Sequence, residues 1–206
     1  TQGPVATSLT SFRDYQMTEA WVWEHLALTR ARPVAGADDL AADVEAVRHA
    51  VLDRGHPRDK IIEEVATMRA RIAAAKQADG PWDAKLGPGR LQDVELIGQA
   101  GSLMAGSQAR RAREGLEAAV ACGWLDDASG AALLEAYLLF WRLQLVSKLL
   151  SDRPLDPAGI GEGGCRMLLR ETGFETLDAL EAALIEVAAA ADAAIHAALG
   201  TQDGEA

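Results

Sequence analysis

The sequence predicts an all-α protein, a helical bundle of about six to eight helices with no sheet. Alanine and leucine dominate the apolar residues of the 206-residue chain, whereas aromatic residues, which strands prefer, make up only 5%. Apolar residues recur at steps of three and four over long segments, and no convincing run alternates apolar with polar residues. Clusters of Gly and Pro separate these segments, as expected for loops between helices.

The first helix is expected over residues 8–31. Its inward positions fall at steps of three and four and form a broad stripe, so this helix should pack against several neighbours near the centre of the bundle. The positions of the stripe are Leu9, Phe12, Gln16, Ala20, Trp23 and Ala27. Pro33 ends the helix, because the residue before a proline is biased away from helical geometry.

Two further helices and a loop are expected next. Asp38 or Asp39 can cap the second helix by accepting hydrogen bonds from its first free N–H groups, and this helix ends near Arg54. The third helix begins at about Asp59. Residues 78–90 contain two prolines and three glycines, which indicates a loop.

Five helices are expected in the second half of the chain. Their ranges are about residues 91–106, 107–122, 127–150, 165–172 and 177–199. Gly123 and Gly173 end two of them, because glycine adopts the left-handed conformation that follows many helices. The most regular apolar period runs through Leu134, Leu138, Trp141, Leu145 and Leu149.

Composition and charge argue against several classes of protein. A net charge of -11 disfavours a nucleic-acid partner, which needs clustered Lys and Arg. No segment approaches about 18 uncharged apolar residues, and the N-terminus lacks the features of a signal peptide, so no membrane partner is expected. Cys122 and Cys165 are expected to be buried free thiols, which fits a cytoplasmic location.

The first candidate site is the segment over residues 20–36. It places Arg30 and Arg32 together where the first helix ends, and two guanidinium groups there could contact a carboxylate or a phosphate. Trp21 and Trp23 are two positions apart and therefore point to different sides of the helix. The alternative is a purely structural helix wedged between two layers, and the residues alone leave both open.

The second candidate is the loop and helix start over residues 81–99, with Lys85, Asp93 and Glu95. Asp93 and Glu95 are about 200° apart on a regular helix, so they cannot both bind one metal ion there. From the residues alone, a structured loop that caps a helix is the favoured interpretation. No phosphate-loop motif and no His or Cys ligand spacing is present, so we assign no catalytic residue and no metal ligand.

Together these two segments resemble the glutamine synthetase adenylyltransferase (glutamate-ammonia-ligase adenylyltransferase) family. Residues 20–34 match A-W-x-W-E-H-x-A-L-x-R-A-R-x-V. The family motif D-[LI]-K-x-x-x-G-G-L-x-D-[IV]-E-F-x-x-Q is represented by Asp83, Lys85, Gly89, Leu91, Asp93, Val94, Glu95 and Gln99. Ala84, Arg90 and Leu96 depart from it, and Arg90 should be strained if the second glycine serves a positive φ.

The resemblance implies a helical accessory domain that follows the C-terminal nucleotidyltransferase core of an enzyme that adenylylates and deadenylylates glutamine synthetase in nitrogen regulation. Residues 1–10 would then be a remnant of the exit from that core, residues 1–150 the helical bundle domain, and residues 151–206 a C-terminal helical extension. ATP and Mg²⁺ would serve the core of the parent enzyme, with no cofactor held in this chain, which alone should be inactive.

The resemblance also implies partners and a junction. The implied partners are the nucleotidyltransferase core of the same parent chain, glutamine synthetase and the PII signal protein. The residues placed at the junction with the core, close to nucleotide, are Arg30, Arg32, Lys85, Asp93 and Glu95, with their loop mobile and their charges solvated or locally paired. The alternative is a non-catalytic docking domain for glutamine synthetase or PII, or the equivalent segment of a PII uridylyltransferase.

Overall fold

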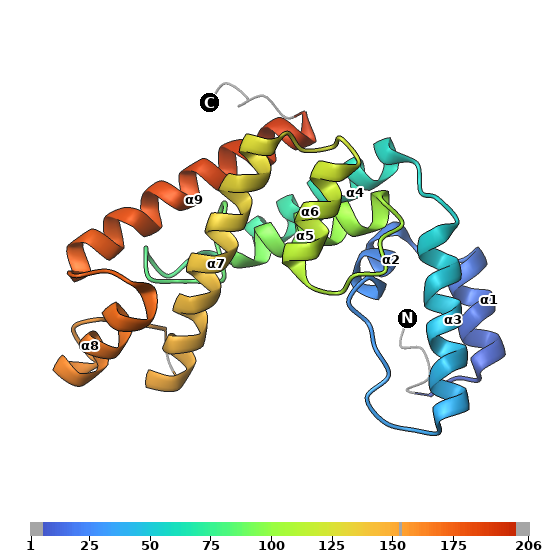
Figure 1. Ribbon diagram of the computed structural model, residues 1–206, viewed down its shortest axis with the longest axis horizontal. Coiled ribbons are helices and arrows are strands. Elements are labelled where there is room, and N and C mark those ends of the chain that lie inside the picture. The colour runs from blue at the N-terminus through green and yellow to red at the C-terminus, as the bar shows by residue number, and fades with distance from the viewer. Residues whose placement is uncertain (1–5, 153, 201–206) are drawn as a thin grey trace.

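The computed structural model describes residues 6–152 and 154–200, and this part of the chain forms nine α-helices and no strand. The helices are α1 (Leu9–Thr18), α2 (Val22–Leu28), α3 (Asp38–Asp53), α4 (Arg58–Ala75), α5 (Leu91–Met104), α6 (Ala112–Ala121), α7 (Asp127–Leu150), α8 (Gly161–Thr172) and α9 (Leu177–Leu199). The predicted all-α class is confirmed. The helices form an arch, with α5 and α6 at its centre, α7, α8 and α9 in one limb, and α1 and α3 in the other (Figure 1).

The centre of the arch is held by an unusually close contact between α5 and α6. A Cβ atom on Gly115 would lie 2.1 Å from the carbonyl oxygen of Gly98, and one on Gly101 would lie 2.4 Å from that of Gly115. Only glycine lets two helix backbones approach so closely without steric overlap. The main cluster of buried side chains surrounds this contact and extends from Leu26 to Leu199 along the sequence. The division into residues 1–150 and 151–206 stays a prediction.

The single first helix expected over residues 8–31 is wrong. The chain breaks between α1 and α2, because the Glu24 carboxylate accepts hydrogen bonds from the Trp21 backbone N–H at 2.8 Å and from the Tyr15 hydroxyl at 2.7 Å. These contacts cap α2 and fold it back on α1. The division of this helix accounts for nine helices where six to eight were expected.

The expected central position of this region is also wrong. α1 lies in the outer limb against α3 (Figure 1), where Leu9 and Phe12 pack on a small separate cluster of buried residues. Trp21 is 64% exposed and Trp23 is 43% exposed, so neither indole anchors the bundle. The broad stripe expected over residues 8–31 is divided between α1 and α2, and these two short helices bury different faces.

Helix boundaries in the second half agree closely with expectation at α7 and α9, whose bounds are as predicted. α6 begins at Ala112, five residues later than expected, because the carbonyl groups of Gln108 and Ala109 accept hydrogen bonds from the Arg48 side chain instead of joining a helix. Asp38 or Asp39 was expected to cap this helix, but both occupy the first turn of α3 and the capping position is Ala37.

The regular apolar period of α7 lies on the outside of the molecule. Leu138, Trp141, Leu145 and Leu149 are 36%, 47%, 48% and 66% exposed. The buried face of α7 is instead formed by Leu133, Ala136, Leu139, Phe140, Leu143 and Val146. α7 is therefore apolar on two faces, and only one of them packs on the described core.

Two expectations drawn from composition need correction. Cys122 is exposed and Cys165 is only partly buried, so the two free thiols are not core residues. α9 is long and apolar enough to cross a membrane by length and composition, contrary to the sequence estimate. Leu180, Leu184, Ala191 and Ile195 of α9 are buried against the rest of the described structure, whereas only 28% of its apolar window as a whole is buried.

Candidate functional site

The candidate site is built around the exit from α2. Beyond Leu28 the backbone forms a tighter turn than in the α-helix, in which the Arg30 N–H donates to the carbonyl of Ala27, three residues earlier, at 3.2 Å. The Arg30 side chain then reaches α5, where Nη1 lies 3.1 Å from Oε2 of Glu95. The Arg30 side chain remains 48% exposed and that of Glu95 24% exposed. The structure thus joins two predicted site residues that are far apart in the sequence.

A buried arginine that the sequence analysis missed holds this exit in place. The Arg48 side chain is only 2% exposed, and it donates to the carbonyl groups of Leu28 (3.1 Å), Thr29 (2.6 Å) and Gln108 (3.1 Å). Burial lowers the pKa of Arg48, and the nearby Arg110 lowers it further. The cation is stabilised by carbonyl groups at the C-terminal end of α2, where the helix dipole favours positive charge.

The only sequence signal for Arg48 was its place on an otherwise apolar face of α3. Its neighbours on that helix, Val47, Val51 and Leu52, are all buried. An arginine among buried residues requires several acceptors, because an unpaired buried cation is very costly. Which carbonyl groups supply them could not be known without the fold.

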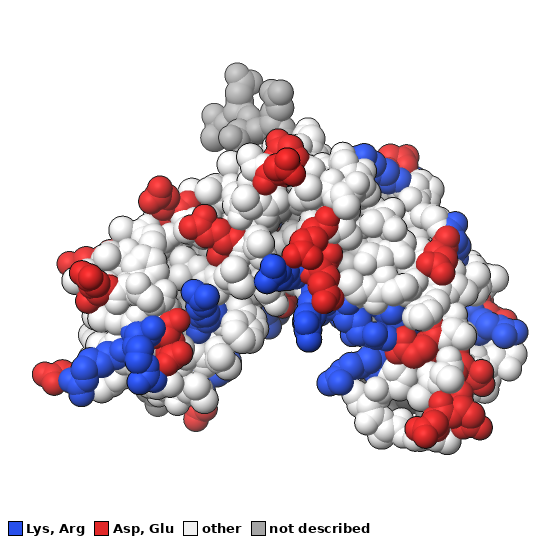
Figure 2. All heavy atoms as spheres, viewed as in Figure 1, with Lys and Arg blue, Asp and Glu red and all other residues white. Residues whose placement is uncertain are grey.

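Two further arginines lie close to the exit. Arg110 donates from Nε to the carbonyl of Ala31 at 2.9 Å and pairs with Glu45. Arg111 immediately precedes α6 and is 82% exposed. We call Arg30, Arg32, Arg110 and Arg111 the basic underside. Figure 2 shows Lys and Arg side chains gathered along the hollowed lower edge of the arch, between its two limbs.

Tyr137 of α7 shows that the basic underside extends to the other limb. Burial raises the pKa of Tyr137, the Glu95 carboxylate raises it further, and Arg30 and Arg111 act in the opposite direction. These electrostatic effects require Tyr137 to lie near the Arg30–Glu95 pair and near Arg111. The pair therefore lies where α2, α5, α6 and α7 meet.

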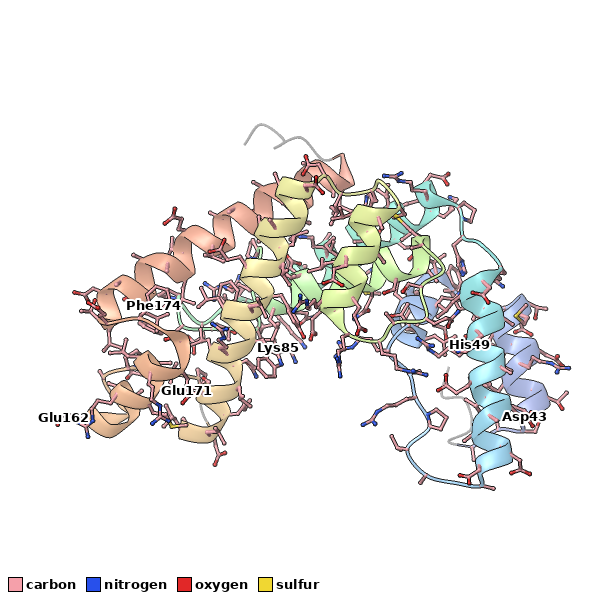
Figure 3. The ribbon with its side chains drawn as sticks, in the orientation of Figure 1. Asp43, His49, Lys85, Glu162, Glu171 and Phe174 are labelled. Carbon is pink, nitrogen blue, oxygen red and sulfur yellow. The ribbon has the colours of Figure 1, made fainter. Side chains whose placement is uncertain are left out.

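The loop over residues 78–90 is closed by its own hydrogen bonds. Asp83 Oδ1 accepts from the backbone N–H groups of Lys85 and Leu86, both at 2.9 Å. Arg90 Nη1 donates to the carbonyl groups of Gly80 (2.8 Å) and Asp83 (2.6 Å). These contacts leave the Lys85 side chain exposed, and Figure 3 places it on the underside of the arch.

Arg90 is not strained, contrary to the expectation from the family motif. Its φ is -92°, and it occupies the capping position of α5. The positive φ of +68° falls on Gly89, where a Cβ atom would also lie 2.0 Å from the carbonyl oxygen of Ala188. Glycine is thus required at position 89 by conformation and by close packing on α9. This tight approach is to another helix rather than to a ligand.

Asp93 lies apart from the other predicted site residues. Its Oδ2 atom accepts from Arg69 Nε at 2.9 Å and from the Gly89 backbone N–H at 3.0 Å. Arg69 also pairs with Asp192, and its Nη1 atom lies 3.3 Å from Nε2 of His196. This cluster joins α4, the loop, α5 and α9. The predicted site therefore divides, with Asp93 on one side of α5 and the Arg30–Glu95 pair on the other. Arg32 and Lys85 are exposed and join neither ion pair.

A cleft of about 520 Å³ borders the Asp93 cluster. It lies between α4, the loop and α9, and most of its walls are aliphatic. Its polar lining is formed by Arg69, Lys76, Gln77, Gln92, Asp93, Asp192 and His196. The charged groups among Arg69, Asp93 and Asp192 are already paired with one another, so the cluster can hold the walls of the cleft in place.

The structure describes no group of three or more His, Cys, Asp or Glu residues in residues 6–152 and 154–200 that could hold a metal ion. The described site consists of arginines at a helix junction, an exposed lysine and one half-exposed ion pair. Such groups can bind and orient anionic groups. The described fold and site are those of an all-helical domain with a group of arginines at a helix junction.

Comparisons with known proteins identify the family. The model of the glutamate-ammonia ligase adenylyltransferase family matches residues 1–47, and that of the GlnD PII-uridylyltransferase family matches residues 60–191. Bifunctional glutamine synthetase adenylyltransferase/adenylyl-removing enzymes are similar to most of the chain. The enzyme of Mesorhizobium japonicum is 39% identical over 90% of the chain, that of Rhizobium meliloti 36% over 88%, and that of Rhodopseudomonas palustris (strain TIE-1) 33% over 98%.

The chain belongs to the glutamine synthetase adenylyltransferase family, in a helical region that it shares with the PII uridylyltransferases. It spans 19% to 21% of the length of these three relatives. The resemblance of the two sequence motifs to this family is thereby confirmed.

Proposed function

We propose that this chain is the helical accessory domain of an enzyme that adenylylates and deadenylylates glutamine synthetase, and that its basic underside packs against the nucleotidyltransferase core of the parent chain. The observation that carries the proposal is the fixed exit from α2. Arg48 and Arg110 hold its backbone, while Arg30 and Arg32 extend from it. In a chain with a net charge of -11, a group of arginines carried by this held backbone is suited to an anionic partner.

Each residue of the junction has a proposed role. Glu95 neutralises part of the charge of Arg30 and restrains its orientation. Arg32 forms no ion pair within the described ranges and is exposed, so it is free to contact a phosphate or a carboxylate. Lys85 adds a further exposed cation. ATP and Mg²⁺ would bind in the core of the parent enzyme and supply the adenylyl group and its charge neutralisation there.

The proposed partners beyond the core are glutamine synthetase and the PII signal protein, and the proposed location is the cytoplasm. Glutamine synthetase is the protein named in the description of the similar enzymes. One observation favours a second candidate function. The PII-uridylyltransferase model matches 132 residues, from 60 to 191, which supports a segment equivalent to that of a PII uridylyltransferase or a docking domain for PII.

The test uses the longer enzyme that contains this segment and the 206-residue chain alone. Arg32→Ala in the longer enzyme is expected to lower the transfer of labelled AMP to glutamine synthetase by about tenfold or more, as for the loss of a charged contact made in the reaction. Arg166→Ala on α8, an arginine that is 76% exposed, is the matched control and should leave the rate unchanged. The 206-residue chain alone should leave glutamine synthetase unlabelled.

Three results would contradict this proposal. Transfer by the isolated chain would show that it holds an active site of its own. Equal rates for the Arg32→Ala and Arg166→Ala enzymes would show that Arg32 is not part of the junction. Normal AMP transfer together with lost binding of PII, measured by calorimetry on the same Arg32→Ala enzyme, would favour the docking function.

A further inference from the structure

A cavity of about 300 Å³ adjoins the exit from α2, between the loop over residues 31–37 and helices α1 and α3. Figure 1 shows this loop running beside α3 in the outer limb of the arch. We call the cavity the exit pocket. Most of its lining is apolar, and the larger apolar side chains in it are those of Phe12, Leu28, Pro33, Leu40 and Val44.

The apolar surface continues outside the exit pocket. Leu40, at the start of α3, is 49% exposed, and Val34 in the neighbouring loop is 81% exposed. Exposed apolar side chains that gather in this way mark contact surfaces. The volume of the pocket lies at the lower end of the range for small-molecule sites, and a small molecule in it would leave Val34 in water. A larger partner that inserts one side chain fits this surface better.

The charged residues that line the exit pocket are Arg32, Glu45 and Arg48. Arg48 is buried among backbone carbonyl groups, and Glu45 pairs with Arg110. Arg32 is exposed and forms no ion pair within the described ranges, so the edge of the pocket carries one available cation. A guanidinium group binds a carboxylate through two parallel hydrogen bonds, whereas the apolar walls cannot solvate a charge. The lining therefore suits an apolar group with a carboxylate beside it.

We propose that the exit pocket receives a large apolar side chain from the nucleotidyltransferase core of the parent chain, and that an acidic residue next to that side chain pairs with Arg32. This inference rests on the proposed function and names the contact by which the underside holds the core. The chain spans 19% to 21% of the length of the three similar enzymes, and a partner in the same polypeptide has a high effective concentration. An apolar anchor in a pocket, with a charged contact at its edge, is typical of the residues that dominate binding energy in protein interfaces.

Hydroxyl-radical footprinting of the 206-residue chain and of the longer enzyme tests whether the exit pocket is occupied. In the isolated chain, Leu40 and Ile185 should both be oxidised readily, because they are 49% and 57% exposed. In the longer enzyme, oxidation of Leu40 should fall by about tenfold, because the centre of an interface excludes water. Ile185 lies on α9, far along the chain from the pocket, and is the matched control whose oxidation should not change.

Two pairs of variants test the chemistry of the occupant, each compared in the longer enzyme and in its own isolated chain. Ala41→Trp fills the pocket and should abolish most of the protection of Leu40. Ala46→Trp, at an exposed position of α3 outside the pocket, should keep it. Arg32→Glu places two carboxylates against each other and should also abolish most of the protection, whereas Arg166→Glu on α8 should keep it.

Equal oxidation of Leu40 in the isolated chain and in the longer enzyme would overturn the proposed contact. If the Arg32→Ala enzyme still lost AMP transfer, the accessory function would stand without the pocket. Protection already present in the isolated chain would show that the pocket is filled within this chain, and protection that required added glutamine synthetase would assign the pocket to that protein. Either result would overturn the contact with the core. Protection retained in the Arg32→Glu enzyme would overturn the acidic residue of the occupant.

Discussion

Asp93 and Glu95 are two residues apart in the same motif, yet the structure gives them opposite environments. Asp93 is 11% exposed and accepts two hydrogen bonds, one from Arg69 on α4 and one from the loop backbone. Glu95 is 24% exposed and has one ion-pair partner, Arg30, which is itself half-exposed. The first carboxylate joins four segments of the fold, and the second restrains an arginine on the surface.

The difference shows that a shared motif does not imply a shared role. Because the two residues point to opposite sides of α5, one motif can both hold the fold together and present a charge at a junction. The Asp93 cluster should therefore determine stability, and the Arg30–Glu95 pair should have its effect on partners. The same substitution made in Arg69 and in Arg30 tests whether the two sides of α5 differ in this way.

The largest expected effect belongs to Arg69. Arg69→Leu leaves Asp93 and Asp192 close together with no cation between them, so the free energy of unfolding should fall by about 3–5 kcal/mol. Arg30→Leu, the matched change on the other side of α5, should cost less than about 1 kcal/mol, because its pair is largely exposed. Urea unfolding of both variants measures the difference. Equal losses for the two arginines would show that the division between the sides is wrong.

A pH series adds a third buried polar contact, that between His25 and His56. Its contribution to stability can be separated from those of the two ion pairs. His25 and His56 lie with ring centroids 5.0 Å apart, and His25 is fully buried. Burial, together with the nearby His25 and Arg54, lowers the pKa of His56 from 6.5 to about 4. The unfolded chain therefore binds the proton at a higher pH than the folded chain, so stability is complete above pH 6.5 and falls as the pH drops towards 4.

The expected loss of stability between pH 7 and pH 4 from His56 is about 2 kcal/mol, below the full value of the pKa shift because the ring is only partly buried. His56→Phe should flatten the decline, whatever its effect at neutral pH. His49→Phe is the control, since the His49 side chain is 51% exposed. Thermal melts of the three proteins across this range provide the slopes. An unchanged slope in the His56→Phe protein would exclude this histidine as the cause.

The parts of the fold that sequence predicted well are those determined by local signals. α7 and α9 begin after Asp126 and Thr176, whose side chains accept from the backbone of the first turn, and Gly200 follows α9 in the left-handed conformation. The break before α2 depends on Glu24 contacting Tyr15 nine residues away, which no local period reveals. The period through Leu138, Trp141, Leu145 and Leu149 misleads because it is that of a buried face, although these four side chains are exposed.

The candidate site could be predicted only in part for the same reason. The motif indicated that Asp93 and Glu95 diverge, because helix geometry alone requires it. Their partners could not be predicted, since Arg69 and Arg30 lie on other helices or their exits, 24 and 65 residues away. Arg48 was missed because its acceptors are backbone carbonyl groups, and these leave no mark in the residue types.

Glu95→Gln should have the smallest effect on stability of these changes. The pKa of Tyr137 reports the electrostatic change that accompanies it. The free energy of unfolding should change by less than about 1 kcal/mol, and most of that change should disappear in concentrated salt, which screens exposed pairs. The electrostatic change remains measurable, because Glu95 raises the pKa of Tyr137. Removing the carboxylate should lower that pKa, which an absorbance titration detects. A Tyr15→Phe background isolates the signal, since Tyr15 is the other of the two tyrosines.

Asp93→Asn is the control on the other side of α5, and it should lower stability in low and high salt alike while leaving the pKa of Tyr137 unchanged. If Asp93→Asn moved the Tyr137 pKa and Glu95→Gln did not, the two carboxylates would have been assigned to the wrong sides of the helix.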